Sequence, residues 1–125
     1  SYDQMVMVEA DEYKIFQVIY NLVNNAINYT GDDKQIWVRQ IVREDGYVRI
    51  EVTDSGEGIA PEALPYVWDR YYKVDKTHKR AVMGTGLGLS IVKNILELHD
   101  ARYGVESEVG KGSTFWFELK VYQIV

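Results

Sequence analysis

The chain has 125 residues, of which 46% are hydrophobic and 26% charged, with a formal net charge of −5 and no cysteine. This size predicts one domain over residues 1–125, and the acidic balance argues against nucleic acid as the main partner. The lack of cysteine excludes disulfides and thiolate sites. Because no apolar run approaches the ~18 residues of a membrane span and no signal peptide is visible, we expect a cytoplasmic domain.

The first half of the chain predicts a strand, a long helix and a hairpin. Residues 4–10 are typical of a short strand, and a helix follows from Asp11, its N-cap, to about Tyr29. Residues 35–44 and 46–54 alternate in polarity around Asp45-Gly46, a pair typical of hairpin turns. The apolar residues of the helix recur at steps of three and four and share one face: Ile15, Ile19, Leu22, Val23 and Ala26.

The second half predicts a short helical stretch, a second helix and a second hairpin. A loop leads into the short stretch, which ends within residues 67–75. The second helix begins near Leu87, and residues 102–122 alternate as two strands joined at Gly110-Lys111-Gly112. Strands in one layer and helices in the other predict an α/β two-layer sandwich. The apolar face of the second helix contains Ile91, Val92, Ile95 and Leu96.

Three asparagines share one stripe of the first helix. Asn21, Asn25 and Asn28 follow the spacing i, i+4, i+7. Asparagine is a poor helix former, and a solvated face usually carries Lys, Glu and Arg, which this helix almost lacks after Lys14. Neutral amide oxygens also suit Mg²⁺, which takes few protein ligands and keeps phosphate and water oxygens. From the residues alone, the stripe is either a solvated face or a magnesium site.

An aspartate ends the strand at residues 46–54. Asp54 has the same parity as Val48, Ile50 and Val52, so its carboxylate faces the core side and needs a donor there. The exocyclic amine of adenine is such a donor, and the glycines at positions 56 and 58 leave room for a flat ring. An ordinary turn aspartate is the alternative.

A run of glycines precedes the second helix. Gly84, Gly86 and Gly88 match neither the dinucleotide fingerprint nor the P-loop, so what remains is attraction of phosphate to free amides and a helix N-terminus. Upstream, residues 70–80 contain five cations and one anion. Such a basic loop either closes over an anion such as a triphosphate or is simply solvated.

Five motifs in sequence order resemble those of sensor histidine kinases. They are NLVNNAINYT, DSGEGI, VWDRYYKVD, GTGLGLSIVK and GKGSTFWFEL, and they match the asparagine box, first glycine box, aromatic box, second glycine box and final glycine-threonine motif. The chain is similar to the catalytic, ATP-binding domain of that family. The resemblance implies a Bergerat fold, in which a mixed, mostly antiparallel sheet packs on about three helices. It also implies a flexible lid, over residues 73–85, that covers ATP and Mg²⁺.

The resemblance assigns roles by position. Asn25 matches the magnesium ligand and Asn21 lines the same site; Asp54 matches the acceptor of the adenine amine; Arg70 and Lys73 match cations that reach the terminal phosphate. Asn21, Asn25, Arg70 and Lys73 are thereby assigned to catalysis. The implied nucleotide-binding set is Asn25, Asn28, Tyr29, Asp54, Gly56, Gly58, Ile59, Tyr72, Gly84, Thr85, Gly86, Leu87, Gly88, Leu89 and Thr114, with Thr114 as a hydroxyl near the adenine.

Several positions depart from the family pattern. Many members have lysine where Asn28 stands, which puts one phosphate contact in doubt. Trp68 replaces a phenylalanine, and Asp100-Ala101 stands where a Gly-Gly pair often ends the second helix. A domain that binds nucleotide without transferring phosphate is therefore one alternative.

A second alternative is a Bergerat-fold ATPase or an anti-sigma serine kinase. Gyrase-like, mismatch-repair and heat-shock ATPases activate water with a glutamate one turn before the magnesium asparagine, and this chain has Asn21 there. The resemblance therefore favours transfer of the γ-phosphoryl group to a histidine. It implies a histidine-bearing dimerisation domain of the same kinase and a response regulator as partners, with the full-length kinase a homodimer. Neither His78 nor His99 lies in the setting of such an acceptor.

Overall fold

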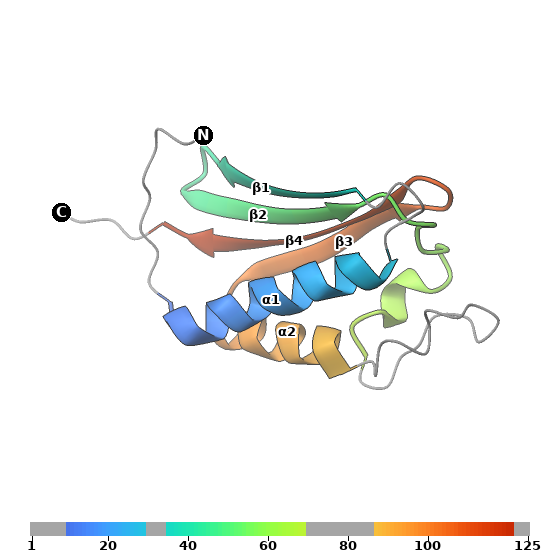
Figure 1. The fold of residues 1–125 in the computed structure, drawn as a ribbon. Coiled ribbons are helices and arrows are strands. Elements are labelled where there is room, and N and C mark those ends of the chain that lie inside the picture. The colour runs from blue at the N-terminus through green and yellow to red at the C-terminus, as the bar shows by residue number, and fades with distance from the viewer. Residues whose placement is uncertain (1–9, 30–34, 70–86, 122–125) are drawn as a thin grey trace.

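The computed structural model describes residues 10–29, 35–69 and 87–121, which form two layers (Figure 1). Both α-helices cover one face of a four-stranded sheet, so the predicted two-layer α/β sandwich is confirmed. Residues 4–9 of the first predicted strand and the predicted lid at residues 73–85 lie outside the described residues. The elements are α1 (Glu12–Tyr29), β1 (Ile36–Val42), β2 (Tyr47–Asp54), the 3₁₀ helix η1 (Leu64–Tyr66), α2 (Leu87–Leu98), β3 (Arg102–Glu108) and β4 (Gly112–Lys120).

The sheet has the strand order β1-β2-β4-β3, and each neighbouring pair is antiparallel. Both predicted hairpins form, with Gly46 at φ 90° in the turn between β1 and β2. Val52 lies opposite Phe115 in the register of β2 and β4. Since opposite residues in an antiparallel pair share a face, this register sends the apolar residues of both strands toward the helices.

The core lies between the helices and this sheet face. Trp68 extends it, since its ring meets Tyr103 and Phe115 edge to face at centroid distances of 5.0 and 5.5 Å. Burial, together with the hydrogen bond that Tyr103 donates to Glu97, raises the pKa of Tyr103 to about 12. The buried apolar residues are Val18, Leu22, Ala26, Val48, Val52, Val67, Val92, Ile95, Leu96, Phe115, Phe117 and Leu119.

Polar contacts fix the ends of both helices. Asp11 is the N-cap of α1, as predicted, because its Oδ1 accepts a hydrogen bond from the Lys14 amide at 3.1 Å. The Asp11 amide donates to His99 Nε2 at 3.0 Å, so the end of α2 also supports the start of α1. Asp100 follows α2 with φ 57°, the left-handed conformation that commonly ends a helix.

Two local details refine the prediction. The predicted short helical stretch contains the 3₁₀ helix η1 (Leu64–Tyr66), in which the Val67 amide donates to the Leu64 carbonyl at the i+3 spacing, and residues 70–75 lie outside the described part of the chain. The described residues thus contain two α-helices and one 3₁₀ helix. The sequence places Ile91 on the apolar face of the second helix, but its side chain is 37% exposed and lies at the edge of the buried stripe of α2.

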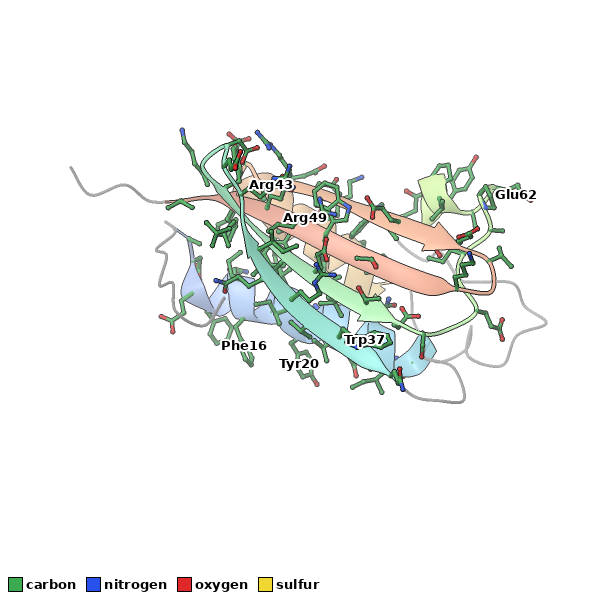
Figure 2. The ribbon with its side chains drawn as sticks, turned by 90° about the horizontal axis from the view of Figure 1, so that it is seen from above. Phe16, Tyr20, Trp37, Arg43, Arg49 and Glu62 are labelled. Carbon is green, nitrogen blue, oxygen red and sulfur yellow. The ribbon has the colours of Figure 1, made fainter. Side chains whose placement is uncertain are left out.

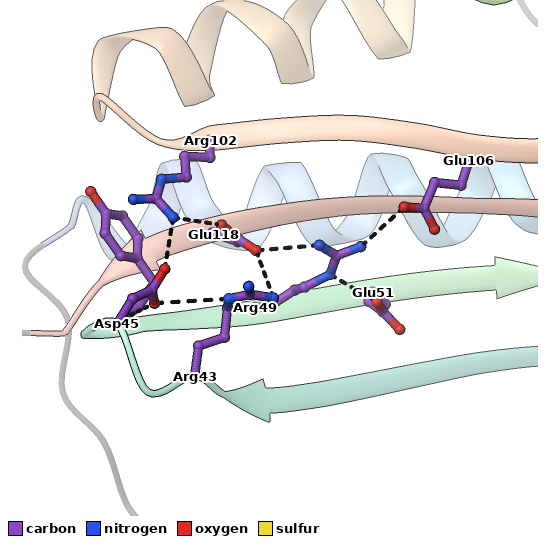
Figure 3. Close-up of polar contacts among 8 residues, drawn as sticks. Arg43, Asp45, Arg49, Glu51, Arg102, Glu106 and Glu118 are labelled. Carbon is purple, nitrogen blue, oxygen red and sulfur yellow. Dashed lines mark hydrogen bonds and ion pairs between the residues drawn. The ribbon is translucent and has the colours of Figure 1, made fainter.

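The sheet face turned away from the helices carries a charged cluster (Figure 3). Glu118 is only 3% exposed and lies between three guanidinium groups, those of Arg43, Arg49 and Arg102, at 3.4, 3.3 and 3.3 Å. A hydrogen bond from Arg102 lowers the pKa of Asp45, and the same bond raises the pKa of Arg102. Because a buried carboxylate is tolerated only when it is paired, this cluster holds β2, β3 and β4 together on the outer face.

The outer side of α1 is aromatic. Phe16 and Tyr20 are 66% and 59% exposed and stack with ring centroids 6.4 Å apart (Figure 2).

Neither α1 nor α2 has the length and the unbroken apolar character that crossing a bilayer requires.

Candidate functional site

Four chain segments that are distant in sequence meet at one end of the sandwich. Figure 1 shows the C-terminal end of α1, the end of β2, the start of α2 and the β3–β4 turn on the same side of the molecule. The predicted asparagine stripe, first glycine box and the start of the second helix therefore reach a common region. The candidate site lies at this end of the sandwich and is formed by these four segments.

Asp54 is the most buried polar side chain in this region. It is 2% exposed, because β2 alternates and places it on the helix side together with Val48 and Val52. Its Oδ1 accepts a hydrogen bond from the Gly56 amide at 2.8 Å, the two-residue pattern of an Asx turn. This bond fixes the carboxylate and starts the turn into the glycine loop. The predicted inward direction of Asp54 is confirmed.

The loop after Asp54 is locked against the β3–β4 hairpin. Gly58 has φ 81°, and an added Cβ would overlap the carbonyl oxygen of Glu108, so this position requires glycine. The amide of Gly110 donates to the carbonyl of Glu57 at 2.7 Å. Glycine at position 58 therefore permits close packing of two backbones, in addition to any room it leaves for a ligand.

Two serines extend this contact. The Ile59 amide donates to Ser107 Oγ at 2.7 Å, and Ser107 Oγ lies 2.8 Å from Ser113 Oγ. Ser113 is 7% exposed and lies directly opposite Asp54 in the β2–β4 register. Ser113 consequently shares the helix-side face with Asp54. Ile59 itself packs against the core.

The structure does not bring Thr114 to this site. Thr114 lies opposite Thr53, and their hydroxyl oxygens are 2.9 Å apart. Because side chains alternate along a strand, this pair points to the outer face of the sheet, away from Asp54. The register thus contradicts the predicted place of Thr114 beside Asp54, and Ser113 is the hydroxyl on the same face of the sheet as Asp54.

The asparagine stripe lies at the edge of the buried face of α1. Asn21, Asn25 and Asn28 are half-buried, and within residues 10–29, 35–69 and 87–121 their amides have no hydrogen-bond partner. A half-buried amide oxygen in that situation has capacity for water or a hard cation. The donor set therefore fits a magnesium ion that keeps most of its ligands from water and phosphate.

Gly88 lies near the start of α2 with no described residue close to it. An added Cβ at Gly88 would meet nothing within 4 Å in the described structure. Leu89 instead packs against the core. Packing thus explains Leu89, and no contact of the described residues requires glycine at position 88.

The structure does not describe the side chains of the other predicted site residues. Tyr29 is the last residue of α1 and Leu87 the first of α2, and their side chains are not described. Six more predicted positions lie outside the described residues: Arg70, Tyr72, Lys73, Gly84, Thr85 and Gly86.

Sequence reasoning missed Ser107, Ser113 and the role of Gly112. Gly112 has φ 98°, and an added Cβ would overlap the carbonyl oxygen of Asp54. The parity of Ser113 with Phe115, Phe117 and Leu119 could have placed Ser113 on the core side. No local pattern indicates that Ser107 bonds a residue 48 positions earlier in the chain.

The sequence matches a known family over residues 10–123, described as "Histidine kinase-, DNA gyrase B-, and HSP90-like ATPase". It is 42% identical over 118 residues to Drug sensory protein A of Synechocystis and 45% identical over 111 residues to Sensor protein SrrB of Staphylococcus aureus. Each match covers 87% of this chain but only 18% of the relative.

Solved structures share the fold. Full-length ShkA in complex with AMPPNP superposes with a TM-score of 0.79 at 28% identity, over 96% of this chain and 24% of that one. The nucleotide-free catalytic domain of histidine kinase ThkA superposes with a TM-score of 0.75 at 34% identity, over 90% of this chain and 70% of that one.

Proposed function

The chain belongs to the histidine kinase-, DNA gyrase B- and HSP90-like ATPase family, as the catalytic ATP-binding domain of a sensor histidine kinase, and from this premise we propose that it binds Mg-ATP and transfers the γ-phosphoryl group to a histidine of a separate dimerisation domain. The burial and fixed position of Asp54 support the proposal most strongly. It is a buried carboxylate whose position is fixed by the Gly56 amide at the end where α1 and α2 meet.

On the adenine side, Asp54 supplies the selective contact. An ionised carboxylate only accepts hydrogen bonds, so it suits the exocyclic amine of adenine and opposes the carbonyl oxygen that guanine has in the same place. Gly56, Gly58 and Ile59 form the adjoining wall, whose backbone the β3–β4 hairpin holds in place.

On the phosphate side, α1 and the start of α2 act together. Asn25, with Asn21 one turn earlier, would hold the magnesium ion, which neutralises phosphate charge when bound. The open side of Gly88 at the start of α2 would admit phosphate oxygens to the backbone. Arg70 and Lys73 keep their predicted roles at the terminal phosphate, and Asn28 lines this side in place of the family lysine.

Kinase activity is favoured over hydrolysis because of Asn21. A carboxamide cannot take a proton from water, so the position that holds a general base in the related ATPases has none here. Transfer would then depend on positioning the phosphate in line with a histidine nitrogen and on neutralising its charge.

The partners follow from this chemistry. The chain spans about a fifth of the length of the curated relatives it matches, 18% in each case. We propose that the whole protein is a homodimeric two-component kinase whose dimerisation domain carries the acceptor histidine. A response regulator would take the phosphoryl group next, in the cytoplasm.

Phosphoryl transfer in trans tests the proposal. The chain is incubated with γ-labelled ATP and Mg²⁺, alone and with a histidine-bearing dimerisation domain. Alone, it should neither label itself stably nor release phosphate quickly; with the partner, it should label the histidine through an acid-labile bond. Asn25→Ala should slow the labelling by about tenfold or more, because the ion loses a protein ligand beside the phosphates.

The control is Asn24→Ala, an exposed asparagine on the same helix, which should label the partner at the normal rate. Rapid phosphate release by the chain alone, undiminished in Asn25→Ala, would contradict both the kinase assignment and the metal site.

A further inference from the structure

The Ser107 hydroxyl is the centre of a small hydrogen-bond network between β3, β4 and the loop after Asp54. It accepts from the Ile59 amide at 2.7 Å, donates to the Gly112 carbonyl at 2.9 Å and lies 2.8 Å from the Ser113 hydroxyl. The partners come from two distant parts of the chain: Ile59 from the loop after Asp54, and Gly112 and Ser113 from the start of β4. One hydroxyl therefore connects the Gly56–Ile59 loop to the strand that faces Asp54.

The hydrogen count fixes the direction of each bond. A serine hydroxyl has one proton and can accept two hydrogen bonds. Since the Ser107 proton goes to the Gly112 carbonyl, the Ser113 proton must go to Ser107, and the second acceptor position receives the Ile59 amide. Ser107 thus uses its whole capacity, and no other arrangement of protons satisfies all three contacts.

The bond to Ile59 matters because it holds the loop at its far end. Asp54 Oδ1 binds the Gly56 amide at the start of the loop, and Ser107 binds the Ile59 amide at its end. Between them, Gly58 packs directly on the Glu108 backbone. The wall beside Asp54 is therefore positioned by side-chain hydrogen bonds at both ends, with the backbone bond from the Gly110 amide to the Glu57 carbonyl between them.

We propose that Ser107 is a positioning residue for adenine selectivity: it acts through the Ile59 amide and fixes the distance between the Gly56–Ile59 loop and the Asp54 carboxylate. This inference rests on the proposed function, since it assumes that adenine binds beside Asp54. Selectivity by hydrogen bonding needs tight placement of the acceptor and of the wall opposite the ring. A loop released from Ser107 would accept purines in more than one orientation.

The test compares Ser107→Ala with Thr53→Val. Thr53 makes an equivalent hydroxyl–hydroxyl bond, 2.9 Å to Thr114, on the opposite face of the same sheet and away from the loop. The dissociation constants of ATP and GTP are measured for the 125-residue chain and both variants, together with their urea midpoints. Both variants should lose stability, Ser107→Ala more because its hydroxyl makes three bonds, but only Ser107→Ala should lower the preference for ATP over GTP, by about tenfold.

The titrations distinguish a failure of the proposed function from a failure of the role given to Ser107. If the unmodified chain binds neither nucleotide, the proposed function is overturned and this inference falls with it. If ATP binds and Ser107→Ala keeps the ATP-over-GTP ratio of the unmodified chain, this inference alone is overturned.

Amide hydrogen exchange of the unmodified chain gives a second measurement, which holds even if Ser107→Ala does not fold. The Ile59 amide should exchange slowly although it lies in a loop, because it donates a hydrogen bond to the half-buried hydroxyl of Ser107. Exchange as fast as in a solvent-exposed loop would overturn the proposal.

Discussion

Asp54→Asn is expected to weaken ATP binding by about 100-fold, which corresponds to about 2.7 kcal/mol. Asparagine has the shape of aspartate, and its amide oxygen can still accept from Gly56 at the position of Oδ1. Its other terminal atom then becomes an NH₂ group that faces the adenine amine, donor against donor. Turning the amide to meet adenine would instead leave the buried Gly56 amide without its acceptor. Isothermal titration with ATP and Mg²⁺ measures the loss.

The matched control is Glu62→Gln, which makes the same chemical change on an exposed side chain outside the loop (Figure 2). It should bind ATP like the unmodified chain. If Asp54→Asn also binds ATP normally while its urea midpoint is unchanged, Asp54 does not contact the base.

Gly112→Ala is expected to destabilise the domain by about 4 kcal/mol, a large part of the stability of a typical domain. Two effects add at this position. The backbone has φ 98°, which a residue with a Cβ rarely adopts, and the added Cβ would overlap the Asp54 carbonyl oxygen. Since the Asp54 carbonyl is backbone, it cannot move aside without separating β2 from β4. Urea unfolding followed by circular dichroism measures the change.

Gly110→Ala separates the two effects. Gly110 has φ 86° in the same turn, but an added Cβ there meets nothing within 4 Å. It should therefore show the conformational cost alone, about 1–2 kcal/mol. Equal losses in the two variants would show that the contact between Gly112 and Asp54 is not tight.

The layers of the fold could be predicted because each depends on a local pattern. The steps of three and four in α1 and the alternation in β2 and β4 each decide which face is buried, and both hairpins have glycine at their turns. The direction of Asp54 follows from the same alternation. The pattern predicts the short helical stretch at η1 but not its 3₁₀ type, which depends on the i+3 bond from the Val67 amide to the Leu64 carbonyl.

The site was predictable only in part, since several of its contacts join distant residues. The family motif points to Thr114, whereas strand parity places Ser113 on the side of Asp54. The contacts of Gly58 with Glu108 and of Ser107 with Ile59 depend on how the β3–β4 turn docks on the glycine loop. The burial of Glu118 among three arginines depends on the alignment of three strands in the same way.

Selection of adenine by the buried carboxylate at the end of β2 is tested by calorimetric titration of the unmodified chain with ATP and, separately, with GTP in the presence of Mg²⁺. ATP is expected to bind, and GTP at least about 100-fold more weakly, because guanine presents a carbonyl oxygen to the Asp54 carboxylate where adenine presents an amine. Binding of GTP as tight as that of ATP would show that Asp54 does not select the base.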